Sequence, residues 1–204
     1  VLLDEHHTVL RPAILWNDGR SGAQCEQLTA DVPGLAGITG NLAMPGFTAP
    51  KLLWVREHEP ALFAQVRRVL LPKDWLRLQL TGEAVSEMSD AAGTLWLDCA
   101  RRDWSDPVLE ACGLTREHMP RLVEGSEVSS FLSPDLCTRW GLPARVPVAG
   151  GAGDNAASAV GMGAVQPGQG FLSLGTSGVL FVVTPQYQPN AASATHAFCH
   201  AVPG

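Results

Sequence analysis

The chain has 204 residues and a formal net charge of −6, with 46% hydrophobic and 17% charged residues. This length and composition can bury a sizeable core, and the acidic balance argues against a nucleic-acid binder held by a general basic surface. No apolar run approaches the roughly 18 residues that a membrane helix needs. Acidic and histidine residues stand close to the first position, so no signal peptide is expected either.

The five cysteines are spread through the chain without a Cys-x-x-Cys pair. This pattern favours buried thiols in a reducing cytoplasm over a zinc site or a disulfide framework. His196 and His200 have the spacing of helical metal ligands, but no third ligand stands nearby, so no metal site is predicted. The chain begins at Val1 rather than Met and stops at Gly204 without a closing element, and we expect a fragment of a longer protein.

Short strands and helices are expected through the first part of the chain. Residues 13–16 form an apolar run typical of a strand, and after a turn the residues 21–30 predict a helix with Cys25 and Leu28 inward. Residues 31–41 are rich in Gly and Pro and indicate a loop. A second helix is expected from Thr48, whose hydroxyl would cap it before an early proline.

Further along, residues 66–71 predict a buried strand, and a helix is expected from Pro72 to Gly82. The stretch 83–105 is ambiguous, with a candidate strand over residues 94–97. Short helices are expected over 106–112 and 133–141.

The composition changes near Pro143 to small, apolar and Gly-rich residues. Residues 146–149 predict a strand, 156–164 a helix, and 171–174 with 179–183 a hairpin. We therefore expect two domains, over residues 1–145 and 146–204, and an α/β fold.

The strongest chemical signal is the acid in the segment Gly150-Gly-Ala-Gly-Asp154-Asn155. Glycines around Asp154 would let a ligand approach the backbone, and the start of a helix favours an ionised carboxylate. Such a carboxylate can orient a substrate hydroxyl toward phosphorus and accept its proton late in the reaction. The structural alternative is a helix cap in a glycine-rich turn.

A second Gly-rich element, Gly175-Thr176-Ser177-Gly178, joins the two strands of the expected hairpin. Backbone N–H groups of such a turn can converge on an anion, and the hydroxyls of Thr176 and Ser177 add donors. The turn lacks the Walker pattern, and alone it is equally typical of a simple hairpin.

A third element, Trp16-Asn-Asp18-Gly-Arg20, combines an indole face with polar neighbours, as sugar sites do. The alternative is a surface turn with an ion pair between Asp18 and Arg20.

These elements, in this order, resemble the FGGY carbohydrate kinases. The resemblance rests on the segment from Gly46 to His58, which is similar to the family's N-terminal signature, on the Asp154 loop, and on the turn at residues 175–177. Within the family, stretches such as ILWNDGR and LLPKDWLRLQLTGE look most like the members that phosphorylate xylulose.

The resemblance implies two ribonuclease-H-like domains flanking a cleft, the architecture of actin, hexokinase and Hsp70, here truncated at both ends. It implies ATP-dependent phosphorylation of D-xylulose at C5, with Mg²⁺ carried by the nucleotide. Asp154 would be the base, and Gly175, Thr176 and Ser177 would face the phosphates. The residues expected to contact or support the sugar are Trp16, Asp18, Arg20 and Asn155.

Several alternatives stay open. The acceptor could be gluconate, ribulose or glycerol, and the chain could be a non-catalytic binding module on the same fold. The partners expected are the sugar and ATP, with a homodimer as an option and without nucleic acid or membrane. The family's first phosphate loop and part of its sugar pocket would precede Val1, so we expect the fragment alone to be inactive. Asp74 and Asp90 are interpreted mainly as cap or turn residues, and Lys51 as structural.

Overall fold

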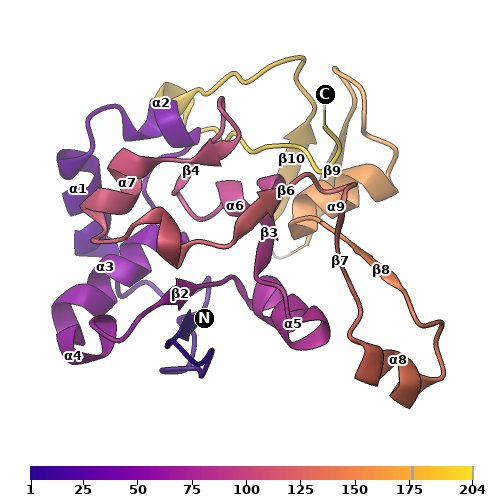
Figure 1. The fold of residues 1–204 in the computed structure, drawn as a ribbon. Helices are drawn as coiled ribbons and strands as arrows, with labels where there is room; N and C mark the ends of the chain where they lie inside the picture. The colour runs from indigo at the N-terminus through magenta and orange to yellow at the C-terminus, as the bar shows by residue number, and fades with distance from the viewer. Residues whose placement is uncertain (176, 204) are drawn as a thin grey trace.

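The computed structural model describes residues 1–175 and 177–203, which form a mixed α/β structure of short elements (Figure 1). The helices are α1 (Gly22–Asp31), α2 (Leu35–Thr39), α3 (Thr48–His58), α4 (Pro60–Phe63), α5 (Pro72–Thr81), α6 (Met88–Ala92), α7 (Asp106–Ala111), α8 (Pro134–Trp140) and α9 (Asp154–Gly161), with 3-10 turns η1 (Arg116–His118) and η2 (Ala191–Ser193). None of them is both long enough and apolar enough to cross a lipid bilayer.

The strands pair two by two within the described residues. Four of the pairs are antiparallel, and β3 with β6 is parallel. The pairs are β1 (Leu2–Leu3) with β2 (Arg68–Val69), β3 (Val85–Glu87) with β6 (Arg121–Val123), β4 (Leu97–Asp98) with β5 (Asp103–Trp104), β7 (Val128–Phe131) with β8 (Pro147–Ala149), and β9 (Gly170–Leu174) with β10 (Gly178–Val182).

Local start and stop signals predicted several helices well. The helix α5 begins at Pro72 and ends before Gly82, whose φ of 78° is the left-handed conformation that glycine favours. The hydroxyl of Ser133 accepts a hydrogen bond from the Leu136 N–H at 3.4 Å and starts α8. The helix α1 buries Cys25 and Leu28 as expected, and the hairpin β9–β10 is confirmed.

Two predictions in the first part are wrong. Residues 13–16 form no strand, because no neighbouring strand pairs with them, and Trp16 is 80% exposed. The expected loop over 31–41 contains the helix α2, which fits between Gly34 and Gly40, both with φ of 78°.

Three other boundaries differ from the sequence prediction. Thr48 is the first residue of α3 rather than its cap, and no side chain caps that helix. The strand expected over 66–71 shrinks to the two residues of β2, because its partner β1 is equally short. The helix expected over 156–164 begins two residues earlier, at Asp154, and ends at Gly161.

The hydrophobic core lies mainly in the first 123 residues. Helices α1, α3, α6 and α7 surround it, and the fully buried Trp96 donates its indole N–H to the sulfur of Cys112 at 3.3 Å. Other members of this core are Leu28, Leu52, Leu53, Leu95, Leu97, Val108 and Leu109. A smaller cluster of Leu3, Leu70 and Leu78 joins β1 to α5.

The last residues return to the first part of the chain, as the yellow end of the ribbon shows (Figure 1). The backbone N–H of Ala197 donates to the Gly40 carbonyl oxygen at 3.1 Å, and the side-chain amide of Asn41 donates to the Ala197 carbonyl oxygen at 3.0 Å. Cys199 is buried beside Cys99.

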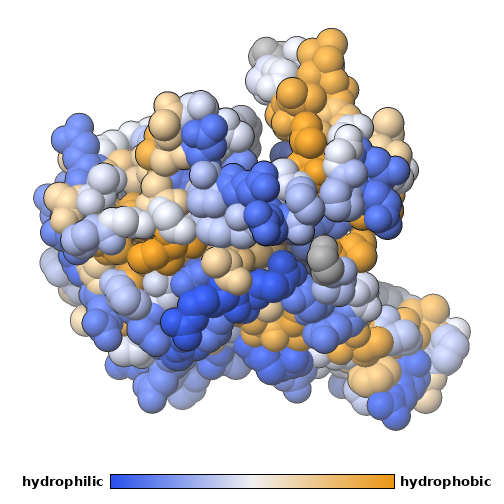
Figure 2. Space-filling view, turned by 90° about the horizontal axis from the view of Figure 1, so that it is seen from above, coloured by the Kyte–Doolittle hydropathy of each residue, from blue (hydrophilic) through white to orange (hydrophobic). Residues whose placement is uncertain are grey.

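The hairpin β9–β10, in contrast, projects from the body with apolar side chains on its surface (Figure 2). Those exposed residues are Leu172, Leu174, Leu180 and Val182.

Candidate active site

Asp154 is the first residue of α9, directly after the glycine-rich loop that follows β8. Its Oδ1 accepts hydrogen bonds from the backbone N–H of Asn155 at 2.7 Å and from the Asn155 side-chain amide at 3.2 Å. The N-cap position belongs to Gly153, so the alternative of a capping aspartate is wrong. The side chain is exposed, and the helix N-terminus beside it favours a negative charge. A ligand can therefore reach the Asp154 carboxylate from solvent.

Arg77 of α5 holds the strand end that leads into the Asp154 loop. Its guanidinium donates to the Ala149 carbonyl oxygen at 2.6 Å, and also to the Gly150 carbonyl oxygen and the Ser129 hydroxyl. Arg77 is only 7% exposed, so these charged hydrogen bonds are shielded from water. The loop is thereby fixed to α5 and β7.

Two glycines of the loop serve close packing of the backbone. A Cβ on Gly150 would clash with the carbonyl oxygen of Glu124, and Gly151 has a φ of 82°. Their N–H groups donate to the carbonyl oxygens of Glu127 at 2.8 Å and Gly125 at 2.9 Å, respectively. At Gly150 the expectation that the glycine leaves room for a ligand is therefore wrong, because neighbouring backbone fills the space. At Gly151 the glycine is favoured by its left-handed backbone conformation instead.

A pocket of about 300 Å³ opens beside Trp16. Its lining is mostly apolar, with the side chains of Arg11, Thr48, Lys51 and Asp90 as polar members. The volume and this mixture of groups are those of small-molecule sites. The Lys51 ammonium donates to the Gly46 carbonyl oxygen at 2.7 Å, and burial lowers the pKa of Lys51. Trp16 thus lies at the wall of a pocket large enough for a small sugar.

Asp18 and Arg20 bind each other rather than lining this pocket. Arg20 donates from Nε and Nη2 to the two carboxylate oxygens of Asp18, at 2.9 and 2.7 Å. The hydrogen bonds from the Arg20 side chain and backbone lower the pKa of Asp18 to about 2. The guanidinium carbon of Arg20 also lies 4.8 Å from the ring centroid of Trp54, a cation–π contact. The pair stabilises the turn that carries Trp16.

A cluster of charged side chains that the sequence analysis missed lies between the pocket and the Asp154 loop. The Lys73 ammonium lies 2.7 Å from Asp74, 3.4 Å from Glu87 and 3.5 Å from Asp90. Burial lowers the pKa of Lys73, but the three carboxylates outweigh it, and the net pKa is raised. The cap of α6 is Glu87, whose carboxylate accepts from the N–H groups of Ser89 and Asp90. No local sequence signal marked this helix start, because the capping-box pattern requires Ser or Thr followed three residues later by Glu or Gln, and residues 87–90 do not match it.

Asp90 is where the pocket and the Asp154 helix meet. It lines the pocket, and its Oδ1 lies 3.4 Å from the position that a Cβ on Gly153 would occupy. Burial raises the pKa of Asp90 to about 6, although Lys73 opposes the shift. The interpretation of Asp90 as mainly a cap or turn residue is therefore too narrow.

The turn expected to bind phosphate closes on itself, with the Gly175 N–H donating to the Ser177 carbonyl oxygen at 3.0 Å. Ser177 is exposed. Thr176 lies outside the described residues. Among the residues that the structure describes, no hydrogen bond or ion pair joins Asp154 to this turn.

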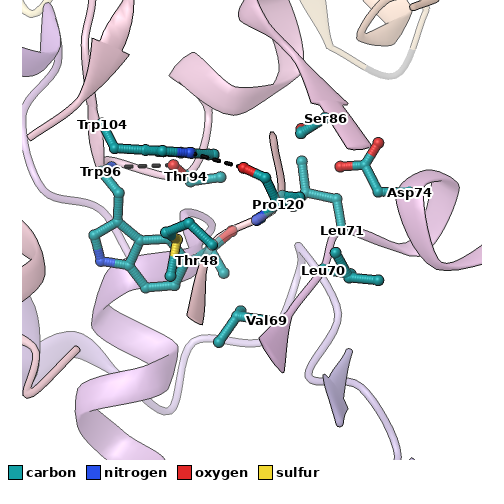
Figure 3. Close-up of a pocket in the computed structure, with 11 residues that line it drawn as sticks. Thr48, Val69, Leu70, Leu71, Asp74, Ser86, Thr94, Trp96, Trp104 and Pro120 are labelled. Atoms are coloured by element: carbon teal, nitrogen blue, oxygen red, sulfur yellow. Dashed lines mark hydrogen bonds between the residues drawn. The ribbon is translucent and has the colours of Figure 1, made fainter. Parts of the chain in front are cut away.

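A second, smaller cavity lies next to the hydrophobic core, beside Trp96 and Trp104 (Figure 3). Asp74 and Ser86 stand on one side of it and Trp96 on the other. Its volume of about 10 Å³ admits roughly one water molecule, which excludes it as a substrate site.

The two spaced histidines have separate partners. The Nδ1 atom of His196 lies 2.8 Å from the Asn41 side-chain oxygen, and Nε2 of His200 lies 3.1 Å from the Ala164 carbonyl oxygen. In residues 1–175 and 177–203, no three His, Cys, Asp or Glu side chains gather in a group that could hold a metal ion.

Comparison with known proteins shows which family the chain resembles and how much of each relative it covers. The chain is 60% identical over 202 residues to the xylulose kinase of Escherichia coli K12, covering 99% of this chain and 42% of that protein. It is 41% identical over 201 residues to the xylulose kinase of Bacillus subtilis 168, covering 98% of this chain and 40% of that protein. The chain thus spans about two-fifths of the length of these relatives.

Solved structures show the same fold. A kinase from Brucella ovis, named as a xyloylose kinase, superposes with a TM-score of 0.97 at 59% identity and covers 99% of this chain and 42% of that one. The xylulose kinase of Rhodospirillum rubrum gives a TM-score of 0.93 at 30% identity, with 100% and 42% covered. The expected α/β sugar-kinase fold is confirmed. The model of the FGGY family of carbohydrate kinases, N-terminal domain, matches residues 1–161, and the chain therefore belongs to the FGGY family.

Proposed function

We propose that the protein transfers the γ-phosphoryl group of ATP to the C5 hydroxyl of D-xylulose, forming D-xylulose 5-phosphate and ADP. The FGGY membership and the likeness to xylulose kinases support a sugar kinase with this acceptor. The observation that carries the proposal is the exposed carboxylate of Asp154 at the start of α9, with Asp90 linking its loop to the pocket beside Trp16.

Asp154 would act as the base. Its carboxylate would accept a hydrogen bond from the C5 hydroxyl and aim that oxygen at the γ-phosphorus. In the loose transition state of phosphoryl transfer the attacking alcohol keeps its proton until late, so the base receives the proton as the new P–O bond forms. Asn155 already donates two hydrogen bonds to Oδ1, which would hold the carboxylate in one orientation.

The sugar side would be formed by Trp16, whose exposed ring can cover the C–H face of the substrate. Asn155 would hydrogen-bond to sugar hydroxyls. Asp18 and Arg20 would act indirectly, because their bidentate ion pair fixes the turn of Trp16.

The nucleotide side would include Gly175, Thr176 and Ser177, whose N–H and hydroxyl groups would face the phosphates. Mg²⁺ would arrive with ATP, where it neutralises charge that develops on the phosphates. We place the start of a second, nucleotide-binding domain near residue 146. A cytoplasmic location fits buried free thiols, and a homodimer remains part of the proposal for its assembly.

The test is Asp154→Asn in the protein at the full length of its relatives. This variant keeps the size of the side chain but removes proton acceptance, so kcat should fall by about 10²–10⁴-fold. The dissociation constant for D-xylulose, measured by calorimetry, should stay within about 3-fold, because the pocket beside Trp16 is untouched. Ordinary turnover by this variant would exclude Asp154 as the base.

The acceptor is tested separately by comparing kcat/KM for xylulose, ribulose, gluconate and glycerol on the unmodified protein. Xylulose should give the largest value. A larger value for another acceptor would correct the substrate while keeping the kinase. Failure to bind both D-xylulose and an ATP analogue in calorimetry would instead favour a non-catalytic module.

A further inference from the structure

The hydroxyl of Ser89 connects the charged cluster to the loop of Asp154. Ser89 lies in α6 and is 5% exposed. Its Oγ donates to the Glu87 carboxylate at 2.7 Å and accepts the backbone N–H of Gly153 at 3.0 Å. Ser89 and Gly153 are 64 residues apart in sequence, so this hydroxyl joins α6 to the start of α9.

The surroundings of Glu87 fix the direction of these hydrogen bonds. The Glu87 side chain is fully buried, and its oxygens accept from the N–H groups of Ser89 at 2.7 Å and Asp90 at 2.9 Å, with the Lys73 ammonium 3.4 Å away. A carboxylate among donors can only accept, so the hydroxyl proton of Ser89 points to Glu87. The lone pairs of Ser89 then face the N–H of Gly153, which also can only donate.

Gly153 occupies the position immediately before Asp154 and is the N-cap residue of α9. The first N–H groups of a helix have no partner within the helix, so an outside acceptor fixes where the helix starts. Asp90 packs below the same residue, with its Cα and Cβ 3.5 Å from the place of a Cβ on Gly153. Ser89 thereby holds the start of α9 through a hydrogen bond, and Asp90 holds it through van der Waals packing.

We propose that Ser89 is a positioning residue for Asp154: its hydroxyl, oriented by Glu87, holds the Gly153 amide and so sets the carboxylate of Asp154 against the sugar pocket. The inference rests on the proposed function, since it assigns Ser89 a part in the same phosphoryl transfer. Ser89 would contact neither the sugar nor the phosphate. Its effect would pass through one backbone hydrogen bond.

The test uses Ser89→Ala, Ser89→Thr and Asp154→Asn in the protein at the full length of its relatives. In Ser89→Ala, kcat for D-xylulose should fall about 10–100-fold, because a shift of about 1 Å at a reacting group costs on the order of 10²-fold. KM for D-xylulose should change less than about 3-fold. Ser89→Thr keeps the hydroxyl and should restore kcat to within about 5-fold of the unmodified protein.

A second readout is hydrogen exchange at the Gly153 amide, which should be at least about 10-fold faster in Ser89→Ala than in Ser89→Thr. The matched control is Ser105→Ala, a buried serine before α7 whose side chain makes no cap hydrogen bond, and it should leave both readouts unchanged. If Ser89→Ala fails to fold, Ser89→Cys decides by the same measurements, because a thiol is only a weak hydrogen-bonding group.

The outcomes separate the two proposals. An unmodified protein without xylulose turnover, or Asp154→Asn with full turnover, overturns the proposed function. When both of those behave as expected, the positioning role of Ser89 is wrong if Ser89→Ala keeps its kcat. It is also wrong if Ser105→Ala lowers kcat as much as Ser89→Ala does.

Discussion

Arg77 offers a direct test of how the Asp154 loop is held. Substitution of Arg77 by Met keeps a long apolar side chain but removes the donors to the Ala149 and Gly150 carbonyl oxygens and to the Ser129 hydroxyl. A hydrogen bond from a charged group contributes about 1.5–3 kcal/mol. Water can reach the partly buried Ala149 oxygen, so we count about 3 kcal/mol of local stability lost rather than the full sum.

The loss should be concentrated in the loop. The N–H groups of Gly150 and Gly151 donate to the Glu127 and Gly125 carbonyl oxygens, and they exchange with solvent only when this backbone contact opens. A local loss of about 3 kcal/mol corresponds to exchange on the order of 10²-fold faster at these two amides, since each 1.4 kcal/mol is tenfold. Hydrogen exchange followed by mass spectrometry on peptides covering residues 148–153 measures this change.

Two further variants sharpen the test. Arg77→Lys retains the charge but not the fork of donors, so it should fall between Arg77→Met and the unmodified protein. Arg139→Met on α8 removes an exposed arginine and should leave exchange in the loop unchanged. If exchange at Gly150 and Gly151 rises less than about 3-fold in Arg77→Met, the guanidinium does not hold the loop and the reasoning fails.

Two other predictions concern the pocket. Trp16→Ala should raise KM for D-xylulose about 2–12-fold with little change in kcat, because an aromatic contact adds about 0.5–1.5 kcal/mol and the exposed ring carries little of the fold. Unchanged KM in steady-state assays would remove Trp16 from the sugar site. Asp90 should make stability depend on pH in an unusual direction. Its pKa is raised to about 6 by burial, so between about pH 4 and pH 6 the folded state binds a proton that the unfolded state has lost, and stability falls as pH rises. About a third of the Asp90 side chain is exposed, so solvent screening limits the expected loss of unfolding free energy over this window to about 1–2 kcal/mol. Asp90→Asn should not show this loss. A difference in unfolding free energy between the two proteins that stays constant from pH 4 to pH 7 would contradict the prediction.

What the sequence predicted was local. Pro72 and Gly82 marked α5, and the hairpin β9–β10 followed from apolar runs around a glycine-rich turn, because these signals act within a few residues. The acid at the entry to α9 was also found, since a glycine-rich segment before small residues indicates a loop running into a helix.

What the sequence could not predict depends on partners far along the chain. The parallel pair of β3 and β6 consists of strands of three residues, too short for an alternating pattern to appear. The contact of Arg77 with Ala149 spans 72 positions, and neither residue has a local signal for it. For the same reason Asp74 and Asp90 were assigned local roles, although Lys73 gathers both into one cluster.

The supports of the Asp154 loop have a consequence for catalysis. Ser89 and Asp90 hold the start of α9, and Asp90 also walls the pocket beside Trp16. The same short helix, α6, therefore supports both the pocket that would hold the sugar and the carboxylate that would take its proton. In-line transfer requires the reacting groups to be placed to well within about 1 Å. A shared support keeps the distance between the hydroxyl and the base constant even if the outer hairpin β9–β10 moves. The glycines at 150 and 125 fit this role, since the absence of a side chain at each lets the loop lie directly on the backbone of residues 124–127. The base is thus carried by packed main chain rather than by a loose turn.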